Sequence, residues 1–416
     1  MFLYLALACD PDSTAPNPPG RKPDPEDTGD TGQIETEPAK WQFLVYMDGD
    51  NDLEDWVIHD LNELEQVGSG DGVEVLVQAD RIEGYSEENR DWTDARRYRI
   101  IGDDDLEHFT TPVAEEIGEV DMGSPDTLAA FLDWASTNYP AERRALILWD
   151  HGSGWELRDP DAETDVAPPP SIASDDTDGG VLSFAEGTFA EGVAASVAAH
   201  GKFDVIAFDA CNMGGWEVMH SIVPYAHAGS GAQTWEGWEG LQYGPALSFL
   251  RANVDVTPQQ MAEELSRGAV EDGGENTHSA IDLGALAGLD GAIDALAAAA
   301  LADPELAAAL MLNRDAARGV EVGRTYKNWF LDLGDLAAVT VASEDPVLAP
   351  LGADILTALD AAVVHSFASE DYSWVGGLTI WFDPHAENID LYTEGAGATW
   401  ATDTRWGDLM RSYVAL

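Results

Sequence analysis

The sequence is poor in cysteine, and this shortage excludes one class of small secreted protein. Only two cysteines, Cys9 and Cys211, occur in 416 residues, which is too few for a disulfide framework. Their sequence contexts differ so much that they are not expected to pair, and each needs its own explanation. A zinc-binding pattern is also lacking, because the following histidines are scattered: His59, His108, His220 and His227.

Basic residues are scarce as well, at 20 against 78 acidic residues, for a formal net charge of −58. Such a surface repels phosphates and anionic lipid head groups, so no nucleic-acid partner is expected. It favours basic peptides, basic side chains and divalent cations. A solvated acidic surface without a specific partner is the plainer interpretation. No repeat of fixed period stands out, which argues against a solenoid or a propeller.

The first nine residues look like the end of an export signal. Residues 1–8 (MFLYLALA) are apolar and precede Cys9, but they lack a basic start and are too short to cross a bilayer as a helix. They are similar to the end of a bacterial lipoprotein signal, in which the cysteine is lipidated. An ordinary signal peptide and an uninformative terminus are the alternatives. We predict a secreted or cell-envelope protein that reaches the membrane only through a lipid anchor at Cys9.

Residues 10–40 are rich in Pro, Thr, Asp and Glu, with Ile34 as the only large apolar side chain before residue 40. Such a segment cannot bury enough surface to fold and is typical of a linker. The predicted organisation is therefore a signal-like segment 1–9, a disordered acidic linker 10–40 and a folded domain 41–416 with helical additions near its C-terminus.

From Trp41 onward, short apolar runs alternate with helical patterns. Strands are expected at 41–47, 73–79, 95–101, 144–150, 202–210, 277–283 and 374–382. Helices are expected at 125–138, 187–200, 214–222, 258–271, 284–301 and 303–317. This alternation predicts an α/β fold with a mostly parallel central sheet and helices on both faces. The long polar segment 156–180 is expected to be a functional or disordered loop.

Two of the expected strands run directly into glycine-containing segments that carry a histidine and a cysteine. LILWD leads into His151, and DVIAFDA leads into Cys211, 60 residues later. Ligands bind at the carboxyl ends of strands in open α/β sheets, and a crossover of this length places the two residues on neighbouring or near-neighbouring strands. The pattern therefore predicts that His151 and Cys211 meet at a candidate active site.

This pairing has a clear chemical use. A thiol is mostly protonated near neutral pH, and an adjacent imidazole can accept its proton and later donate it to a leaving amine. The expected helix at 214–222 would favour the thiolate through its dipole, and the backbone amides of Gly152 and Cys211 are candidates for an oxyanion hole. The plainer alternatives are a cysteine that fills the core and a structural histidine.

The two segments LILWDHGSGW (146–155) and FDVIAFDACNMG (203–214) closely resemble the clostripain family of cysteine peptidases, which is related to caspase-like, gingipain and legumain enzymes. Three further segments strengthen the resemblance: YMDGDNDLED (46–55), HSAIDL (278–283) and GGLTIWFDP (376–384). The resemblance spans about residues 41–384. It implies a caspase-like three-layer fold and a cysteine endopeptidase that acts through a thioester acyl-enzyme.

Residue by residue, the resemblance implies that His151 and Cys211 are catalytic and that Asp209 lines the primary specificity pocket. A second pocket acid is expected in the 234–244 loop, where Glu239 and Glu236 are both candidates. Acids at the base of this pocket would select Arg or Lys, because a cation left unpaired in a pocket is costly. A loop-stabilising acid is the alternative for Asp209.

The family resemblance also bears on activation and on metal. Family members are often cut between the histidine and the cysteine, and Arg158 is the only basic residue between His151 and Lys202, so self-cleavage after Arg158 is predicted. The chemistry itself needs no cofactor. Several family members depend on calcium, and the acidic loops 48–52 and 174–180 are candidates for Ca²⁺ binding, although neither fits an EF-hand; helix capping and a solvated loop are the alternative.

Peptide-bond hydrolysis after basic residues is the leading hypothesis from the sequence, with peptide or protein substrates as partners. One rival is a catalytically silent cell-surface module that binds basic peptides in an acidic cleft. Another is a transpeptidase-type ligase that uses the same cysteine and histidine.

Overall fold

The computed structural model describes residues 38–105, 108–155, 172–322, 326–383 and 389–414. Residues from Pro38 onward belong to one unit, and the statements below concern that unit. Cys9, the 10–37 part of the predicted linker and Arg158 lie outside the described residues, so the predicted anchor, linker and cleavage site stay predictions. No helix in the described ranges is long and apolar enough to cross a membrane.

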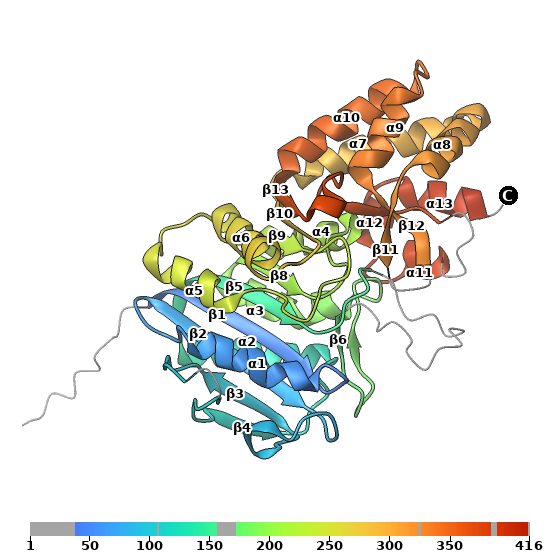
Figure 1. The fold of residues 1–416 in the computed structure, drawn as a ribbon. Helices are drawn as coiled ribbons and strands as arrows, with labels where there is room; N and C mark the ends of the chain where they lie inside the picture. Colours follow the sequence, from blue (N-terminus) through green and yellow to red (C-terminus); the bar gives the residue numbers. More distant parts are fainter. Residues whose placement is uncertain (1–37, 106–107, 156–171, 323–325, 384–388, 415–416) are drawn as a thin grey trace, which may run out of the picture. The chain divides into compact units, whose positions relative to one another are not determined.

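A nine-stranded sheet forms the centre of the described unit, in the order β13-β10-β9-β8-β5-β1-β2-β3-β4 (Figure 1). In chain order its strands are β1 (Ala39–Gly49), β2 (Val73–Arg81), β3 (Ala95–Arg99), β4 (Glu115–Gly118), β5 (Ala141–Trp149), β8 (Phe203–Asp209), β9 (Ala226–Gly231), β10 (Thr277–Asp282) and β13 (Val363–Ala368). The predicted strands in this sheet are present, whereas β4, β9 and β13 were not predicted.

The five central strands of this sheet are parallel, and the two strands at each edge are antiparallel. Strand β1 pairs with β2 and β5, and β8 pairs with β5 and β9, all in parallel. Strands β1, β2, β5 and β8 are mainly apolar and buried on both faces, as is typical of parallel strands. Strand β3, next to the edge strand β4, carries Arg96, Arg97 and Arg99. The sheet is therefore mixed, and the prediction of a mostly parallel sheet holds for its five central strands.

The α-helices are α1 (Glu54–Glu65), α2 (Pro125–Asn138), α3 (Thr188–His200), α4 (Trp216–Ile222), α5 (Tyr243–Ala252), α6 (Pro258–Arg267), α7 (Leu286–Ala302), α8 (Pro304–Ala316), α9 (Leu333–Ala342), α10 (Leu348–Ala362), α11 (Ile389–Glu394), α12 (Thr399–Asp403) and α13 (Trp406–Val414). Helix α2 has the predicted bounds, because Ser124 and Pro125 mark its start. Helix α6 is shorter than predicted, since the chain continues as a π-helical turn, Gly268–Asp272.

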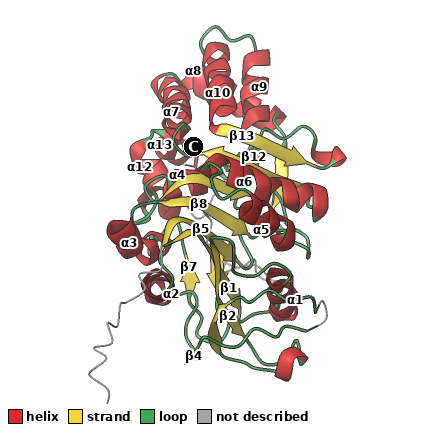
Figure 2. Ribbon diagram, turned by 90° about the vertical axis from the view of Figure 1, so that its left-hand side faces the viewer, coloured by secondary structure: helices red, strands yellow, loops and turns green. Residues whose placement is uncertain are grey.

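Helices cover both faces of the sheet and create two hydrophobic cores. Side chains of β1 alternate between them: Leu44 and Tyr46 face one core, and Phe43 and Val45 face the other, as the two-residue period of a strand requires. Figure 2 shows α2 and α3 on one side of the sheet and α1 and α5 on the other. This is the three-layer arrangement that the sequence predicted.

The chain after β10 builds a second, smaller sheet beside the helices α7 to α10 (Figure 1). Its strands are β11 (Gly319–Val322), β12 (Tyr326–Asp332) and β14 (Thr379–Trp381), in that order and antiparallel. Buried Glu217 of α4 joins this region to the central sheet, because its carboxylate accepts hydrogen bonds from the Trp381 amide and the Tyr392 hydroxyl, each at 2.9 Å. The helical additions predicted for the C-terminal part therefore include strands.

One further hairpin lies close to the carboxyl ends of the central strands. It consists of β6 (Ile172–Ser174) and β7 (Val181–Leu182). Gly152, which follows His151, forms an isolated bridge with Ile172 of this hairpin. The end of the long polar segment predicted as a loop therefore packs beside the histidine.

Candidate active site

His151 and Cys211 leave the sheet from neighbouring parallel strands at the same edge. The last paired residues of β5 and β8 are Trp149 and Asp209, and the Asp150 amide donates a hydrogen bond to the Asp209 carbonyl at 3.3 Å. The histidine and the cysteine are each two residues beyond this pair. The strand register therefore brings together the two residues that the sequence singled out.

Gly152 is required at this edge because the backbone of Cys211 passes directly over it. A Cβ atom at position 152 would lie 2.3 Å from the Cys211 carbonyl oxygen and 3.1 Å from its amide nitrogen. No side chain fits at the first of these distances. The two backbones proposed for an oxyanion hole are thus adjacent.

The imidazole of His151 is held by an aspartate that sequence reasoning did not assign. Its Nε2 lies 2.7 Å from Asp52 Oδ1, and its side chain is 28% exposed. Burial opposes the charged imidazole, but the hydrogen bond to Asp52 and the charges of Asp150 and Asp176 outweigh it and raise the pKa of His151. Asp52 is the partner that orients the ring.

Asp52 is positioned by the chain segment that follows β1, the strand beside β5. The preceding residue, Asn51, donates from Nδ2 to Asp150 Oδ1 at 2.8 Å and to the Ser174 carbonyl at 3.1 Å. Asp150 Oδ2 in turn accepts the Ser174 amide. These bonds tie together β1, β5 and the β6–β7 hairpin around the histidine.

The thiol of Cys211 is enclosed by the loop that follows β9. The Glu236 amide lies 3.3 Å from Sγ. Burial, followed by the charge of Glu236, raises the pKa of Cys211 to about 12. Helix α4 begins at Trp216, two residues later than predicted, and stabilisation of the thiolate by this helix start stays a prediction.

Asp209 is buried beneath this loop and holds it in place. Its carboxylate accepts hydrogen bonds from the Leu241 amide at 2.9 Å and the Tyr243 hydroxyl at 2.6 Å. A Cβ atom at Gly240, where φ is +50°, would lie 2.3 Å from Asp209 Oδ1. These contacts fit the loop-stabilising role that the sequence analysis gave as the alternative for Asp209. Its place in a specificity pocket stays a prediction.

Glu236, and not Glu239, has a buried side chain in the loop whose backbone contacts the thiol. The Glu236 side chain is 5% exposed, and neither of its carboxyl oxygens has a hydrogen-bond partner in the described part of the chain. Glu239 is exposed. Glu275 is also buried. Burial of Glu236, together with the charge of Glu275, raises the pKa of Glu236 well above its usual range.

The histidine beside Glu236 does not neutralise it. His278 Nε2 lies 3.2 Å from Glu236 Oε1, but burial lowers the pKa of His278 to about 4, so the ring is neutral near pH 7. Sequence reasoning missed Glu275 and His278, although the segment HSAIDL that contains the histidine had been noted.

Two tryptophans border the same loop. Trp238 is 63% exposed and stacks on Trp56 of α1, with ring centroids 5.6 Å apart and planes inclined by 14°. Trp235 is also exposed. The stack of Trp238 on Trp56 joins this loop to α1.

The two acidic loops considered for calcium are in direct contact. Asp50 accepts hydrogen bonds from the amide of Asp176 through its carbonyl and from the amide of Thr177 through its carboxylate, each at 2.8 Å. The sequence treated segments 48–52 and 174–180 as separate candidates, whereas the fold makes one acidic cluster of them.

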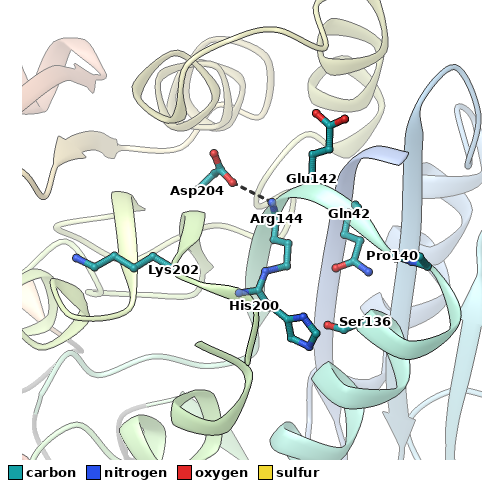
Figure 3. Close-up of a pocket in the computed structure, with 9 residues that line it drawn as sticks. Gln42, Ser136, Pro140, Glu142, Arg144, His200, Lys202 and Asp204 are labelled. Atoms are coloured by element: carbon teal, nitrogen blue, oxygen red, sulfur yellow. Dashed lines mark hydrogen bonds between the residues drawn. The ribbon is translucent and has the colours of Figure 1, made fainter. Parts of the chain in front are cut away.

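A pocket at the other end of the sheet lies away from His151 and Cys211. Figure 3 shows it between Gln42 of β1, Arg144 of β5, and His200 and Lys202 near the start of β8. The Arg144 amide donates to Asp204 Oδ2 at 3.0 Å. Because these residues lie at the amino ends of the parallel strands, the pocket is at the opposite sheet edge from Cys211.

Comparison with known proteins identifies the family to which the chain belongs. Residues 45–413 match the Clostripain family, peptidase family C11, and the chain therefore belongs to this family of cysteine peptidases. Over 222 residues it is 27% identical to clostripain of Hathewaya histolytica. That match covers 50% of this chain and 41% of the relative, so less than half of the relative's length is spanned.

Solved structures of family C11 share the fold. A secreted C11 cysteine protease of Bacteroides thetaiotaomicron, in complex with an irreversible peptide inhibitor, has a TM-score of 0.64 at 16% identity, covering 87% of this chain and 99% of that one. An inactive zymogen C11 protease of Parabacteroides distasonis has a TM-score of 0.60 at 18% identity, covering 91% and 99%.

Proposed function

We propose that this protein is an endopeptidase that cleaves peptide bonds after Arg or Lys, with Cys211 as nucleophile and His151 as general base. The observation that supports the substrate class is the buried carboxyl of Glu236. It belongs to the residue whose amide contacts the thiol, and it has no cationic partner among the described residues. A guanidinium or ammonium group of the substrate supplies the missing charge, because an unpaired buried carboxylate is costly and a paired one is not.

The proposed reaction begins with proton transfer from the Cys211 thiol to His151. The Nε2 atom bonds Asp52, which leaves Nδ1 to take the proton. The sulfur then attacks the substrate carbonyl carbon, and the resulting oxyanion is stabilised by the amides of Gly152 and Cys211. The carbon–nitrogen bond breaks as the imidazolium protonates the leaving amine. Water, deprotonated by the same ring, releases the acid and regenerates the thiol.

The substrate's own charge contributes to this proton transfer. The charge of Glu236 is, after burial, the main influence that raises the pKa of Cys211. A basic side chain that pairs with Glu236 cancels this repulsion, so the thiol loses its proton more readily once the correct substrate is bound. Selection of Arg or Lys and activation of the nucleophile then depend on the same carboxyl group.

The proposal is tested with fluorogenic peptides ending in Arg, Lys, Leu or Glu. We expect turnover of the Arg and Lys peptides, and a loss of at least about 10⁴-fold in kcat/KM for both Cys211→Ala and His151→Ala. Wild-type protein that binds the Arg peptide without turnover would show a silent binding module. Product joined to an added amine in place of water would show a ligase.

We also propose that the protein is secreted, with Cys9 as a lipidated anchor, and that Arg158 is a site of self-cleavage. The apolar segment before Cys9 and the position of Arg158 between the catalytic residues support these proposals. Intact mass of the wild type and of Cys211→Ala, expressed with the complete N-terminus, tests both. A diacylglycerol mass on Cys9 and two chains only in the wild type are expected; an unmodified single chain in both contradicts the proposals.

A further inference from the structure

The pocket of Figure 3, at the amino ends of the parallel strands, contains a buried cation that no acid pairs with. Arg144 is 5% exposed, and within the described ranges no ion pair joins its guanidinium to an aspartate or a glutamate. Arg81 and Arg97, the other buried arginines among the described residues, each pair with a glutamate. In a chain with 78 acidic and 20 basic residues, a buried arginine without an acid is an exception that needs a cause.

The two acids that line the same pocket already have cations of their own. Glu142 pairs with Lys40 at 2.8 Å, and Asp204 Oδ1 pairs with Arg143 Nε at 2.8 Å. The second carboxylate oxygen of Asp204 accepts the backbone amide of Arg144 and not its guanidinium. The charge that lacks a direct partner in this pocket is therefore positive, and it belongs to Arg144.

Two neutral side chains add unpaired oxygens to the pocket. Gln42 is 1% exposed, and its Nε2 donates to the carbonyls of Ala135 and Tyr139, which fixes the orientation of the carboxamide. Its Oε1 and the Oγ of Ser136 are buried and have no hydrogen-bond partner in the part of the chain that the structure describes. Figure 3 shows both oxygens and the Arg144 guanidinium turned toward the same space. Buried polar atoms are rarely left unpaired, so this convergence points to a ligand.

The guanidinium of Arg144 is held rigidly by contacts that leave donors for a ligand. It donates from Nη1 to Ser196 Oγ at 2.7 Å and from Nη2 to the Gly201 carbonyl, and its Cζ lies 4.2 Å from the ring centroid of Phe203. These two hydrogen bonds use two of the five N–H donors of a guanidinium. Burial lowers the pKa of Arg144 to about 10, although the charge of Asp204 opposes the change. The group is therefore charged near neutral pH and poorly solvated, which favours a bound anion.

The size of the pocket limits the ligand to a small molecule. Its volume is about 180 Å³, which is several times the roughly 30 Å³ that one water occupies in the liquid. It is smaller than the pockets of roughly 300–1,000 Å³ that bind drug-sized ligands. An organic anion of a few heavy atoms matches this volume.

We propose that this pocket binds a small carboxylic acid with a hydroxyl or N–H group on the carbon next to the carboxylate. The carboxylate pairs with the planar guanidinium of Arg144 and accepts the hydroxyl proton of Ser136, while the neighbouring donor bonds Gln42 Oε1. A carboxylate without that donor leaves Oε1 unpaired and binds more weakly. Free hydroxy acids, free amino acids and the C-terminus of a peptide share this chemistry.

The test uses the full chain carrying Cys211→Ala, so that its outcome does not depend on the proposed peptidase activity or on self-cleavage. Glycolate, glycine, N-acetylglycine and acetate are titrated by saturation-transfer NMR at about 0.15 M ionic strength, which screens repulsion by the acidic surface. We expect a roughly millimolar Kd for the tightest of the first three acids and at least about fivefold weaker binding of acetate. Tightest binding of N-acetylglycine identifies a peptide C-terminus as the source, and tightest binding of glycolate or glycine identifies a free acid.

Ser136→Ala is the diagnostic variant, because the hydroxyl that it removes has no partner in the described part of the chain. Thr137→Ala is the matched control, since Thr137 is the next residue of α2 and is exposed. We expect Ser136→Ala to weaken binding of the tightest acid about fivefold or more, and Thr137→Ala to leave it unchanged. Arg144→Lys keeps the charge but loses the planar pair of donors, and it should weaken binding at least about tenfold.

Hydrogen exchange locates the bound acid. The tightest acid should slow exchange of residues 133–144 in the Thr137→Ala protein at a concentration that leaves the Ser136→Ala protein unaffected, with α10 unchanged in both. The proposal is overturned if glycolate, glycine and N-acetylglycine all fail to bind, if acetate binds as tightly as they do, or if the Ser136→Ala and Thr137→Ala proteins bind the acid equally.

Discussion

Two groups of carboxyls flank the catalytic pair, and they differ in how their oxygens are arranged. Beside Cys211, Asp209 and Glu275 accept hydrogen bonds from backbone and tyrosine donors of the 234–244 loop, and Glu236 is left without a cationic partner among the described residues. Beside His151, three carboxylates converge within 4.8 Å. The first arrangement suits the single charge of an organic cation, and the second suits a metal ion.

This difference shows that a net charge of −58 is not only a solvated surface. Solvated acids are separated by water and need no partner. Acids that are buried without a counter-ion either take up a proton or bind a cation, and the geometry of their oxygens determines which kind of cation fits. The predictions below test whether the cluster beside the thiol behaves as its geometry requires.

Among variants outside His151 and Cys211, the largest effect is expected from Glu236→Gln. Loss of the buried charge partner should cost a basic substrate about 2–4 kcal/mol, which is roughly 30- to 1,000-fold in kcat/KM for Arg and Lys peptides. Glu239→Gln, in the same loop but exposed, should change kcat/KM less than about twofold. Equal losses in the two variants would place the specificity charge elsewhere.

The same variant separates substrate binding from thiol ionisation. Because the charge of Glu236 raises the pKa of Cys211, its removal lowers that pKa. At an alkaline pH above the raised pKa of Glu236, Glu236→Gln should therefore be alkylated by iodoacetamide faster than the wild type, even though it cleaves Arg peptides more slowly. Slower or unchanged alkylation would contradict the proposed repulsion.

Asp52→Asn should have the next largest effect. Asp52 raises the pKa of His151, and the general base must be neutral, so the wild-type rate falls as pH drops through this raised pKa. Removing the charge lowers the pKa, and the acid limb of kcat/KM should move to lower pH. Loss of ring orientation should reduce kcat by roughly tenfold or more at neutral pH.

The exposed Asp55, three residues further along, provides the control for this change. Asp55→Asn should leave both the acid limb and kcat unchanged. An acid limb that does not move in Asp52→Asn would mean that Asp52 has only a structural role.

The smallest effect is expected from Trp238→Ala. Stacking on Trp56 orders the loop that carries Glu236, and such a pair contributes about 1 kcal/mol. The KM for Arg peptides should rise about fivefold with kcat nearly unchanged, which steady-state kinetics will show. A change in kcat with constant KM would contradict a role in ordering the pocket.

Much of this was predictable from the sequence because the central strands are short apolar runs with clear ends. The strand ends placed His151 and Cys211 at one edge, and Pro125 set the start of α2. By contrast, β9 (AHAGSG) has no β-branched or aromatic residue, so its sequence does not read as a strand, and the smaller sheet depends on contacts between distant segments.

The site was only partly predictable for a related reason. Asp52 bonds His151, 99 residues away in sequence, and Glu275 bonds Gly237, 38 residues away. Spacing alone does not reveal such contacts. The choice between Glu236 and Glu239 depended on which side chain the loop turns inward. The contact between segments 48–52 and 174–180 likewise required the fold.

The most direct measurement is covalent labelling by chloromethyl ketone peptides that end in Arg, followed by mass mapping of the modified residue. The proposed function predicts one adduct per chain on the Cys211 sulfur, formed at least about tenfold faster with Arg than with Leu at the same position and absent in Cys211→Ala. Labelling of another residue, or equal rates with Arg and Leu, would contradict the claim that Cys211 cleaves after basic residues.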